Sequence, residues 1–429
     1  MSNKPSIVLA TFTLQGGGAE RFVLTLGQAF AKMGFSVHVV SFKSQVDYPL
    51  DNSLHYHYLA YQRYRSLPRG WLRYRLFAKV FDRFVQQHIG EPVLVISNLD
   101  QVDNVLHYSQ LKNIVYVIHN TLSVEYGWDQ QPNNQQRQIL KQCYQNHPVV
   151  CVSYGVQRDF EQYLGKHPKI TTIHNPIPQS DILTDAAAFD ALAQLPDNCQ
   201  HGYLIHVGKF KPQKDHHSLI KAYAKSTQQL PLVLLGTGEQ MLSCQTLAAD
   251  LGVAERVIFM GFQPNPYPFI KAASAMVLSS KFEGFGIVIA ESLSLGVPVI
   301  SVDCPSGPSE LLSTHCLVPS GDIMELSDKM SQVMQLSGRC GWLLRVLEEG
   351  MIAPDATMEL VDRPYPELTV KRTADILFNQ VRNEADLLML LENPALSPNW
   401  RQHAADWLEH GTVADWQRRL LGPTSLLLV

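Results

Sequence analysis

The chain has 429 residues, of which 45% are apolar and 17% charged, and its formal net charge at pH 7 is -4. This predicts more than one globular domain and excludes a general attraction to nucleic acid or to an anionic membrane. The seven cysteines show no C-x-x-C spacing and no window is apolar for long enough to span a membrane. We therefore expect a cytoplasmic protein without a disulfide framework, a zinc site, a signal peptide, a transmembrane helix or a nucleic-acid partner.

The first half of the chain alternates short apolar runs with helical segments. Residues 6–12 read SIVLATF, which predicts a buried strand, and residues 19–34 read AERFVLTLGQAFAKMG, which predicts a helix that Gly34 ends. Further strands are expected at 36–42, 92–97, 114–118, 149–153 and 169–173. Strands separated by helices indicate a parallel sheet covered on both faces.

The same alternation starts again after a proline-containing segment at 175–202, which we predict to be a linker. Strands are expected at 203–208, 231–236, 256–261, 275–280 and 297–302. The fold class is therefore α/β, with two tandem doubly wound, Rossmann-like domains at residues 1–175 and 176–323. Such folds bind ligands at the carboxyl ends of their strands, so two facing domains would form a cleft.

The pattern changes after about Asp322. Residues 341–364 predict two strands around a turn, and from Thr369 to Leu421 the pattern predicts three short helices. We expect a short β segment at 324–368 and a small three-helix domain at 369–429.

A paired-glutamate motif lies in the second domain, where residues 281–298 read KFEGFGIVIAESLSLGVP. Phe285 and Gly286 are predicted to begin a helix, and backbone N–H groups at a helix start face an anion well. Glu291 would lie about two turns into that helix, where a carboxylate can accept hydrogen bonds from two ribose hydroxyls. Glu283 would stand before the helix, in the cleft.

Two lysines and two glycines follow other strands of this domain. Lys209 and Lys214 would lie in the loop after residues 203–208, where two ammonium groups can hold a diphosphate without a metal. Gly236 and Gly238 would let the backbone approach a ligand. Taken singly, a loop lysine is more often a solvated charge and such a glycine more often makes a turn. Only their order and spacing favour a site.

In these and further motifs, residues 5–323 resemble the retaining nucleotide-sugar glycosyltransferases of the GT-B fold, the family 4-like group that builds lipopolysaccharide and capsule. The matching segments are GGGAER (16–21), HN (119–120), VGKFKPQK (207–214), LLGTGE (234–239), FEGFGIVIAESLSLGVPVIS (282–301) and GPSELL (307–312). The resemblance implies transfer of a hexose-type sugar, with retained configuration, from a nucleoside diphosphate, by family habit uridine, to a cell-envelope glycan or glycolipid. It implies no cofactor and no metal.

The resemblance also assigns roles. Lys209 stands where the family more often has arginine. The positive charge is kept, but the two parallel hydrogen bonds that a guanidinium can donate to a phosphate are lost. His119 would approach the transferred sugar, although a lone histidine after an apolar strand is otherwise often a core or loop residue. The catalytic candidates are Glu283, His119, Lys214 and Lys209. The donor-binding candidates are Gly17, Gly18, Gly236, Gly238, Phe285, Gly286 and Glu291.

A basic segment occupies residues 61–84, with seven Arg or Lys residues and one Asp. On a helix, Trp71, Tyr74, Ala78 and Phe81 can share one face, and Arg75, Lys79 and Arg83 another. Such a helix could lie on the anionic inner-membrane surface, which would suit a lipid-linked acceptor. Equally, it could cover the domain and leave a solvated basic face. Both readings stay open.

Residues 325–422 resemble a different family, the C-terminal end of MOSC-domain proteins with the three-helix domain that follows it in one bacterial subgroup. The segments are SGRCGW (337–342), RVLEEG (345–350) and ELVDRP (359–364), then LTVKRTADILF (368–378). The cysteine region associated with the cofactor is missing and Cys340 does not replace it, so we expect no molybdenum chemistry. The second domain would be incomplete and joined to a MOSC remnant between about Asp322 and Ser331.

Three functional readings follow from these two resemblances. The first is an active glycosyltransferase. The second is an impaired chimera that binds nucleotide sugar without turnover, and the third is a protein linked to the molybdenum cofactor, which only the tail favours. Whether the join is a natural fusion, a rearrangement or an assembly error stays open.

Overall fold

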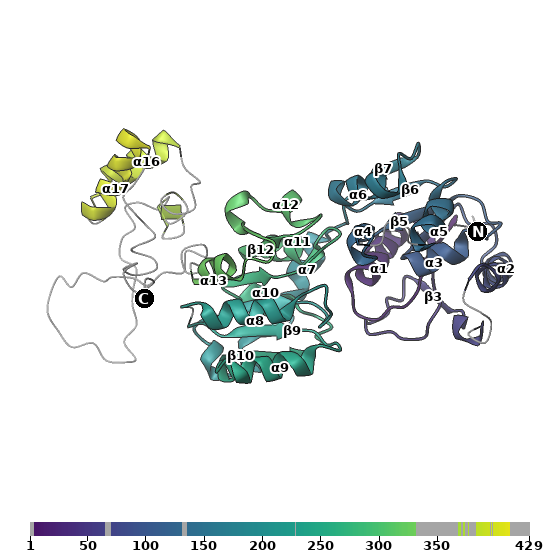
Figure 1. The fold of residues 1–429 in the computed structure, drawn as a ribbon, viewed down its shortest axis with the longest axis horizontal. Helices are drawn as coiled ribbons and strands as arrows, with labels where there is room; N and C mark the ends of the chain where they lie inside the picture. Colours follow the sequence, from purple (N-terminus) through teal and green to yellow (C-terminus); the bar gives the residue numbers. More distant parts are fainter. Residues whose placement is uncertain are drawn as a thin grey trace. The chain divides into compact units, whose positions relative to one another are not determined.

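The computed structural model describes residues 4–64, 70–130, 135–227, 229–331, 368–369, 372–373, 376, 383–394, 396 and 398–411 (Figure 1). The chain divides into two compact units. The first contains Met1–Ala224 and Leu230–Ile323, and the second contains Lys225–Gln229 and Met324–Val429.

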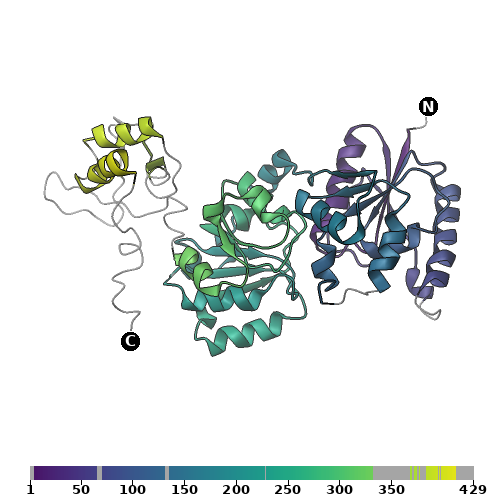
Figure 2. The same ribbon diagram turned by 45° about the horizontal axis from the view of Figure 1, so that its top comes forward.

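The first domain is built on a seven-stranded parallel sheet in the order β3-β2-β1-β4-β5-β6-β7. Its strands are β1 Ser6–Thr11, β2 Ser36–Ser41, β3 His55–Tyr58, β4 Leu94–Asn98, β5 Ile114–Ile118, β6 Val149–Cys151 and β7 Ile170–Thr172. Figure 2 shows helices on both sides of this sheet. They are α1 Gly18–Lys32, α2 Trp71–His88, α3 Asp100–Leu106, α4 Leu122–Glu125, α5 Gln135–Tyr144 and α6 Tyr154–Leu164.

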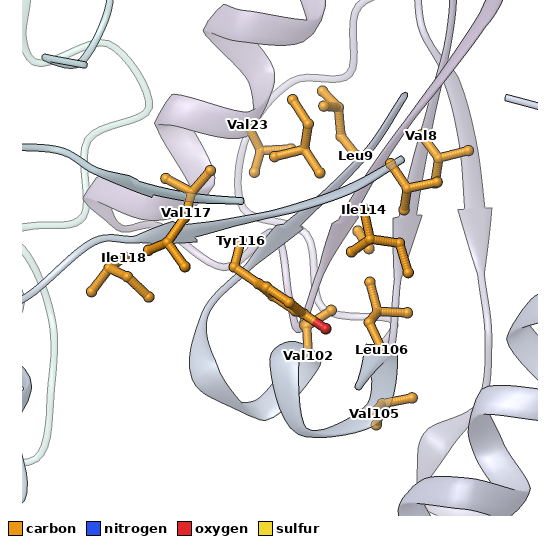
Figure 3. Packing of buried hydrophobic residues seen from close by; sticks show 14 of the residues in the cluster. Val8, Leu9, Val23, Val102, Val105, Leu106, Ile114, Tyr116, Val117 and Ile118 are labelled. Carbon is orange, nitrogen blue, oxygen red and sulfur yellow. The ribbon is translucent and has the colours of Figure 1, made fainter. Parts of the chain in front are cut away.

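The core of this domain consists of the strand side chains that face these helices. Val8 and Leu9 of β1 are 0% exposed, as is Tyr116 of β5 (Figure 3). A parallel sheet that is covered on both faces needs apolar side chains at consecutive strand positions, which explains why the apolar runs predicted its strands.

The second domain has a six-stranded parallel sheet in the order β10-β9-β8-β11-β12-β13. Its strands are β8 Leu204–Val207, β9 Leu232–Leu235, β10 Val257–Gly261, β11 Ala275–Leu278, β12 Val299–Asp303 and β13 Leu317–Pro319. Its helices are α7 Gln179–Asp185, α8 His216–Lys225, α9 Met241–Asp250, α10 Tyr267–Ala272, α11 Ile287–Ser294 and α12 Pro308–Leu311. The predicted tandem α/β architecture is confirmed, and the predicted linker is not structureless, because it contains α7.

Helix α2 carries most of the predicted basic segment. Ala78 and Phe81 are 0% exposed and pack in the first-domain core, whereas Trp71, at the start of the helix, is 61% exposed. The buried face also includes Phe77 and Val85, so Trp71 shares this face by its position on the helix but does not pack in the core. The expectation that this helix covers the domain is confirmed.

Besides Lys225–Gln229, the second unit contains all of α13 Ile323–Ser331 except its first residue, together with α16 Glu384–Glu392 and α17 Pro398–His410. Ile376, Leu387, Leu390 and Ala404 form a small apolar cluster. Asn383 caps α16 by accepting from the Asp386 N–H at 2.9 Å, and Arg372 donates to both carboxylate oxygens of Asp386 at 2.8 Å. The predicted strands at 341–364 lie outside the described residues.

The helices were also compared with the length and hydropathy that a bilayer requires. Within the described ranges, none combines enough residues and enough apolar character to cross a membrane.

Candidate active site

The predicted site residues meet in one cleft of about 720 Å³ within the first unit. It is lined by loops that follow β1, β5, β8, β9 and β11, so that the carboxyl ends of both sheets contribute. Ten of the eleven candidates line it: Gly17, Gly18, His119, Lys209, Lys214, Gly236, Glu283, Phe285, Gly286 and Glu291. Gly238 does not. It packs against the Phe210 backbone, where an added Cβ would come within 2.5 Å of the carbonyl oxygen.

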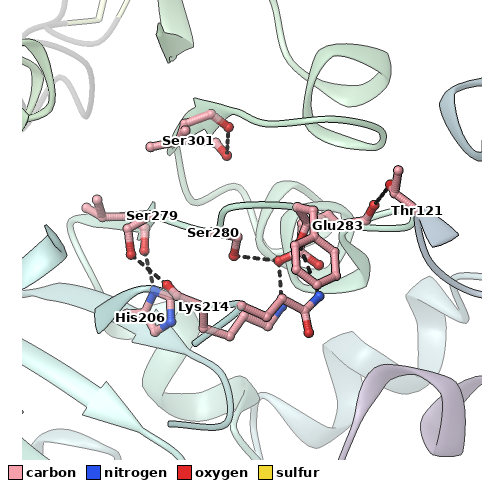
Figure 4. Close-up of polar contacts among 11 residues, drawn as sticks. Thr121, His206, Lys214, Ser279, Ser280, Glu283 and Ser301 are labelled. Carbon is pink, nitrogen blue, oxygen red and sulfur yellow. Dashed lines mark hydrogen bonds and ion pairs between the residues drawn. The ribbon is translucent and has the colours of Figure 1, made fainter. Parts of the chain in front are cut away.

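Lys214 and Glu283 form the polar centre of the second-domain side (Figure 4). The Lys214 Nζ lies 2.5 Å from the Glu283 Oε1, and Ser280 donates to the same oxygen at 2.6 Å. Glu283 is only 6% exposed. The Lys214 ammonium, predicted to face a diphosphate, is therefore paired with Glu283 in this structure while it still lines the cleft.

Lys209 reaches from the second domain to the glycine loop of the first. Its Nζ donates to the Gln15 carbonyl at 2.8 Å. Burial lowers the pKa of Lys209, and Glu20 opposes that effect. A partly desolvated ammonium beside backbone acceptors gains from an additional anion, which is consistent with a place at a phosphate.

Glu291 is held by two residues that the sequence analysis did not assign. The Tyr267 hydroxyl donates to it at 2.8 Å, and the Arg21 guanidinium lies 3.6 Å away and also donates to Tyr267. Burial lowers the pKa of Arg21, but Glu291 and two tyrosines outweigh this and raise it. Arg21 belongs to the GGGAER segment, so the sequence motif already included it. Tyr267 belongs to none of the motifs.

The start of α11 differs from the prediction by two residues. The helix begins at Ile287, and Gly286 is its N-cap with a left-handed φ of 80°. Glu291 is therefore the fifth helical residue, just over one turn into the helix and not two. Phe285 lies before the helix and stacks on the His174 ring, with ring centroids 5.2 Å apart.

The two domains are in close backbone contact at Gly284. A Cβ on this residue would come within 1.8 Å of the His119 carbonyl oxygen. Thr121 donates to the Glu283 carbonyl at 3.0 Å, and Ser153 donates to the Gly284 carbonyl at 2.7 Å. These contacts bring Glu283 to the first domain.

His119 lines the cleft and also packs against side chains of the first domain. Its Nε2 lies 2.9 Å from the Asn98 Oδ1, and its ring packs edge-on against Phe22 at 4.8 Å. Burial lowers the pKa of His119 to about 3, so the ring is neutral at neutral pH. It can exchange hydrogen bonds with a ligand in the cleft but does not supply a positive charge.

The next feature is the arrangement of side chains that could bind a metal ion. Among the side chains that the structure describes, no three His, Cys, Asp or Glu residues are grouped so that they could hold a metal ion. The expectation of a metal-free reaction stays a prediction.

Family comparisons support the fold. Residues 16–180 match the model described as Glycosyltransferase Family 4, and residues 192–340 match Glycosyl transferases group 1. Residues 368–411 match the YiiM-like, 3-alpha helix domain. The match to Glycosyl transferases group 1 ends at residue 340. It therefore continues nine residues past Ser331, the last residue of the region predicted to contain the join.

Individual relatives are also named as sugar transferases. The chain is 31% identical over 149 residues to the lipopolysaccharide 1,6-galactosyltransferase of Salmonella typhimurium, covering 33% of this chain and 39% of the relative. The match thus spans less than half of that relative. A Campylobacter jejuni N-acetylgalactosaminyltransferase acting on a diphospho-undecaprenol substrate is 25% identical over 315 residues, covering 70% and 81%.

Solved structures share the architecture. HepE from Anabaena in complex with UDP-glucose has a TM-score of 0.62 at 20% identity, covering 77% of this chain and 89% of that one. Residues 16–340 therefore match the models of two glycosyltransferase domains and share the two-domain fold of this neighbour. Residues 368–411 of the tail match only the model of a YiiM-like three-helix domain among these families, and none of the three family matches is to a MOSC barrel.

The Lys214–Glu283 pair predicts an asymmetric stability effect. Lys214→Met leaves the buried Glu283 carboxylate without its cation, so we expect a loss of about 1–3 kcal/mol in the free energy of unfolding, measured by urea titration. Adding Glu283→Gln to that variant should recover part of the loss.

Lys281→Met is the matched control, because the Lys281 side chain is 59% exposed and its Nζ lies 3.8 Å from Asp215. An exposed pair contributes about 0–1 kcal/mol. Equal losses in the two single variants would contradict the assignment of a buried pair.

Proposed function

We propose that this protein is a retaining glycosyltransferase that moves a hexose-type sugar from a nucleoside diphosphate to a hydroxyl of a cell-envelope glycan or glycolipid. The observation that carries the proposal is the single cleft that collects Lys209, Lys214, Glu283 and Glu291 beside the start of α11. Homologues named for lipopolysaccharide synthesis and a neighbour solved with UDP-glucose support it.

The donor would use the second-domain side of this cleft. Lys209, Lys214 and the N–H groups at the start of α11 form a cationic region suited to the diphosphate. Glu291 would accept hydrogen bonds from the ribose hydroxyls, either in place of its contacts with Arg21 and Tyr267 or in addition to them. We propose uridine as the base because the HepE neighbour was solved with UDP-glucose.

The negative charge that develops during the reaction would lie beside Lys209, Lys214 and the start of α11. The bond between the anomeric carbon and the phosphate oxygen breaks, and negative charge develops on the leaving diphosphate. The acceptor oxygen bonds to that carbon, and its hydroxyl proton passes to the leaving diphosphate. Preorganised donors stabilise such charge without having to reorganise. Glu283 and neutral His119 would orient the sugar by hydrogen bonds. We propose no nucleophilic role for Glu283, which is held by Lys214 and Ser280.

Turnover tests the proposal directly. The full-length chain is incubated with uridine, guanosine and adenosine diphosphate sugars, and both the melting temperature and the released nucleoside diphosphate are measured. We expect stabilisation and release with a uridine donor, and a loss of at least about 100-fold in release for Lys214→Ala.

Lys281→Ala removes an exposed lysine that does not line the cleft, and it should retain wild-type release. Stabilisation without release by the wild type would favour the impaired chimera, and unchanged release by Lys214→Ala would refute the assignment of Lys214. The anomeric configuration of the product, determined by NMR, decides between retention and inversion.

We also propose that α2 contacts an anionic inner-membrane surface. Trp71, Leu72 and Leu76 are 61%, 42% and 37% exposed, and the exposed face also carries Arg75, Lys79 and Arg83. Apolar and basic side chains together suit the interface of a bilayer. The same face would bring a lipid-linked acceptor to the enzyme.

Vesicle sedimentation tests this contact. We expect binding to vesicles with anionic phosphatidylglycerol, weakened by salt and by Leu72→Ser with Leu76→Ser, and little binding to neutral phosphatidylcholine vesicles. Equal binding by wild type and double variant would argue against the contact. The exposed apolar residue Leu242 of α9, replaced by Ser, serves as the control.

A further inference from the structure

Asn98 is a buried polar side chain at the carboxyl end of β4, the strand that lies between β1 and β5 in the first-domain sheet. It is 0% exposed, and a buried amide is costly unless its donor and acceptor groups find partners. Its partners come from the two neighbouring strands. They are the Ala10 carbonyl of β1 and the ring of His119, which directly follows β5.

The backbone carbonyls decide which amide atom of Asn98 faces His119. One atom of the amide lies 3.1 Å from the Ala10 carbonyl oxygen and 3.5 Å from that of Ile96. An amide oxygen in this position would face two other acceptors, so this atom is the Nδ2, which donates. The Asn98 Oδ1 is therefore the atom that lies 2.9 Å from the His119 Nε2.

This orientation fixes the position of the proton on the His119 ring. The Asn98 Oδ1 can only accept, so the His119 Nε2 carries the hydrogen and donates it. Burial lowers the pKa of His119 to about 3, so the ring is neutral at neutral pH and holds one such hydrogen. The Nδ1 is therefore unprotonated and is a hydrogen-bond acceptor.

The His119 Nδ1 is accessible to a ligand. In the part of the chain that the structure describes, it makes no hydrogen bond, and it is not one of the fully buried polar atoms that lack a partner. His119 lines the cleft, and the edge-on contact with Phe22, at 4.8 Å between ring centroids, holds the plane of its ring. The cleft thus contains an acceptor whose orientation and protonation the protein sets in advance.

We propose that Asn98 is a positioning residue for sugar transfer, which keeps the His119 Nδ1 as an acceptor so that the transferred sugar must present a hydroxyl that donates to it. The inference rests on the proposed function, because it defines how the same cleft recognises its sugar. A sugar with a fluorine or a ketone in place of that hydroxyl places two acceptors against each other, so the cleft rejects it.

Nitrogen-15 NMR of the full-length chain, labelled at histidine, measures the tautomer without any substrate. We expect the signals of a neutral His119 ring with the proton on Nε2, unchanged between pH 6 and pH 8. The signals are assigned by their loss in His119→Gln. A ring with the proton on Nδ1, or a ring that gains a second proton in this range, would overturn the inference.

Asn98→Asp tests the direction of the hydrogen bond to the sugar. A carboxylate beside Nε2 stabilises the protonated ring, so we expect the pKa of His119 to rise and the Nδ1 to become a donor below the raised pKa. The kcat/KM for release of UDP from UDP-glucose, relative to the wild type, should then fall at least about tenfold as the pH is lowered through that pKa. An unchanged or higher ratio at the lower pH would contradict the inference.

Asn104→Asp is the matched control. Asn104 is 5% exposed, its Nδ2 donates to the Asp100 carbonyl at 2.8 Å, and it does not line the cleft. This variant also buries a new carboxylate, but it should leave the His119 signals and the pH dependence of turnover unchanged. Equal pH effects in the two variants would overturn the assignment of Asn98, because burying any carboxylate would then be enough.

Fluorinated donors test the sugar contact. UDP-glucose derivatives with fluorine in place of one sugar hydroxyl at a time are titrated calorimetrically, since fluorine cannot donate a hydrogen bond. At one position, we expect binding to weaken at least about fivefold more in the wild type than in His119→Ala, because only the wild type presents the Nδ1. Equal losses in the two proteins at every position would count against the inference and overturn it.

These readouts separate the inference from the proposed function. If the wild type turns over no donor, the proposed function fails, and the NMR measurement still decides whether the Nδ1 is an acceptor. If the wild type turns over a donor while His119 carries its proton on Nδ1, the inference alone fails.

Discussion

The contact between Gly284 and His119 is the constraint on which the site depends. The two backbones lie so close that a Cβ on Gly284 would come within 1.8 Å of the His119 carbonyl oxygen. Thr121 and Ser153 extend the contact by donating to the carbonyls of Glu283 and Gly284. Since both residues of the close contact follow strands, it brings the carboxyl ends of two separate sheets to one cleft. A larger side chain at Gly284 would separate the groups that must act together.

The charged groups of the cleft have partners within the chain. Glu283 is paired with Lys214, Glu291 accepts from Tyr267 beside Arg21, and Lys209 donates to the Gln15 carbonyl. A buried charge without a partner is costly, so these contacts stabilise the cleft. A nucleoside diphosphate would exchange these partners for phosphate oxygens and ribose hydroxyls. Affinity therefore depends on how much better the ligand satisfies the same groups.

The sequence predicted most of the sheet strands because buried parallel strands need consecutive apolar residues, as in β1 and β5. It missed β3, which reads HYHY at the sheet edge, and the three-residue β13. Glu283 and Glu291 were found because their spacing is local to one loop–helix segment, and Lys214 was found because its loop directly follows a predicted strand. Tyr267 was not found, because only the folded chain brings it to Glu291 and to the distant Arg21. The helix start at Ile287 was misplaced because Gly286 adopts a left-handed conformation that sequence does not reveal.

The account's central claim is that the cleft recognises a nucleoside diphosphate through Lys209, Lys214 and the start of α11. The most direct measurement is calorimetric binding of UDP and of uridine to the full-length chain, with a chelator present. The account predicts that UDP binds at least about tenfold more tightly, because each charge-assisted contact to the diphosphate contributes about 1.5–3 kcal/mol. Equal affinity for uridine and UDP would contradict it, because the two lysines would then contribute nothing to donor recognition.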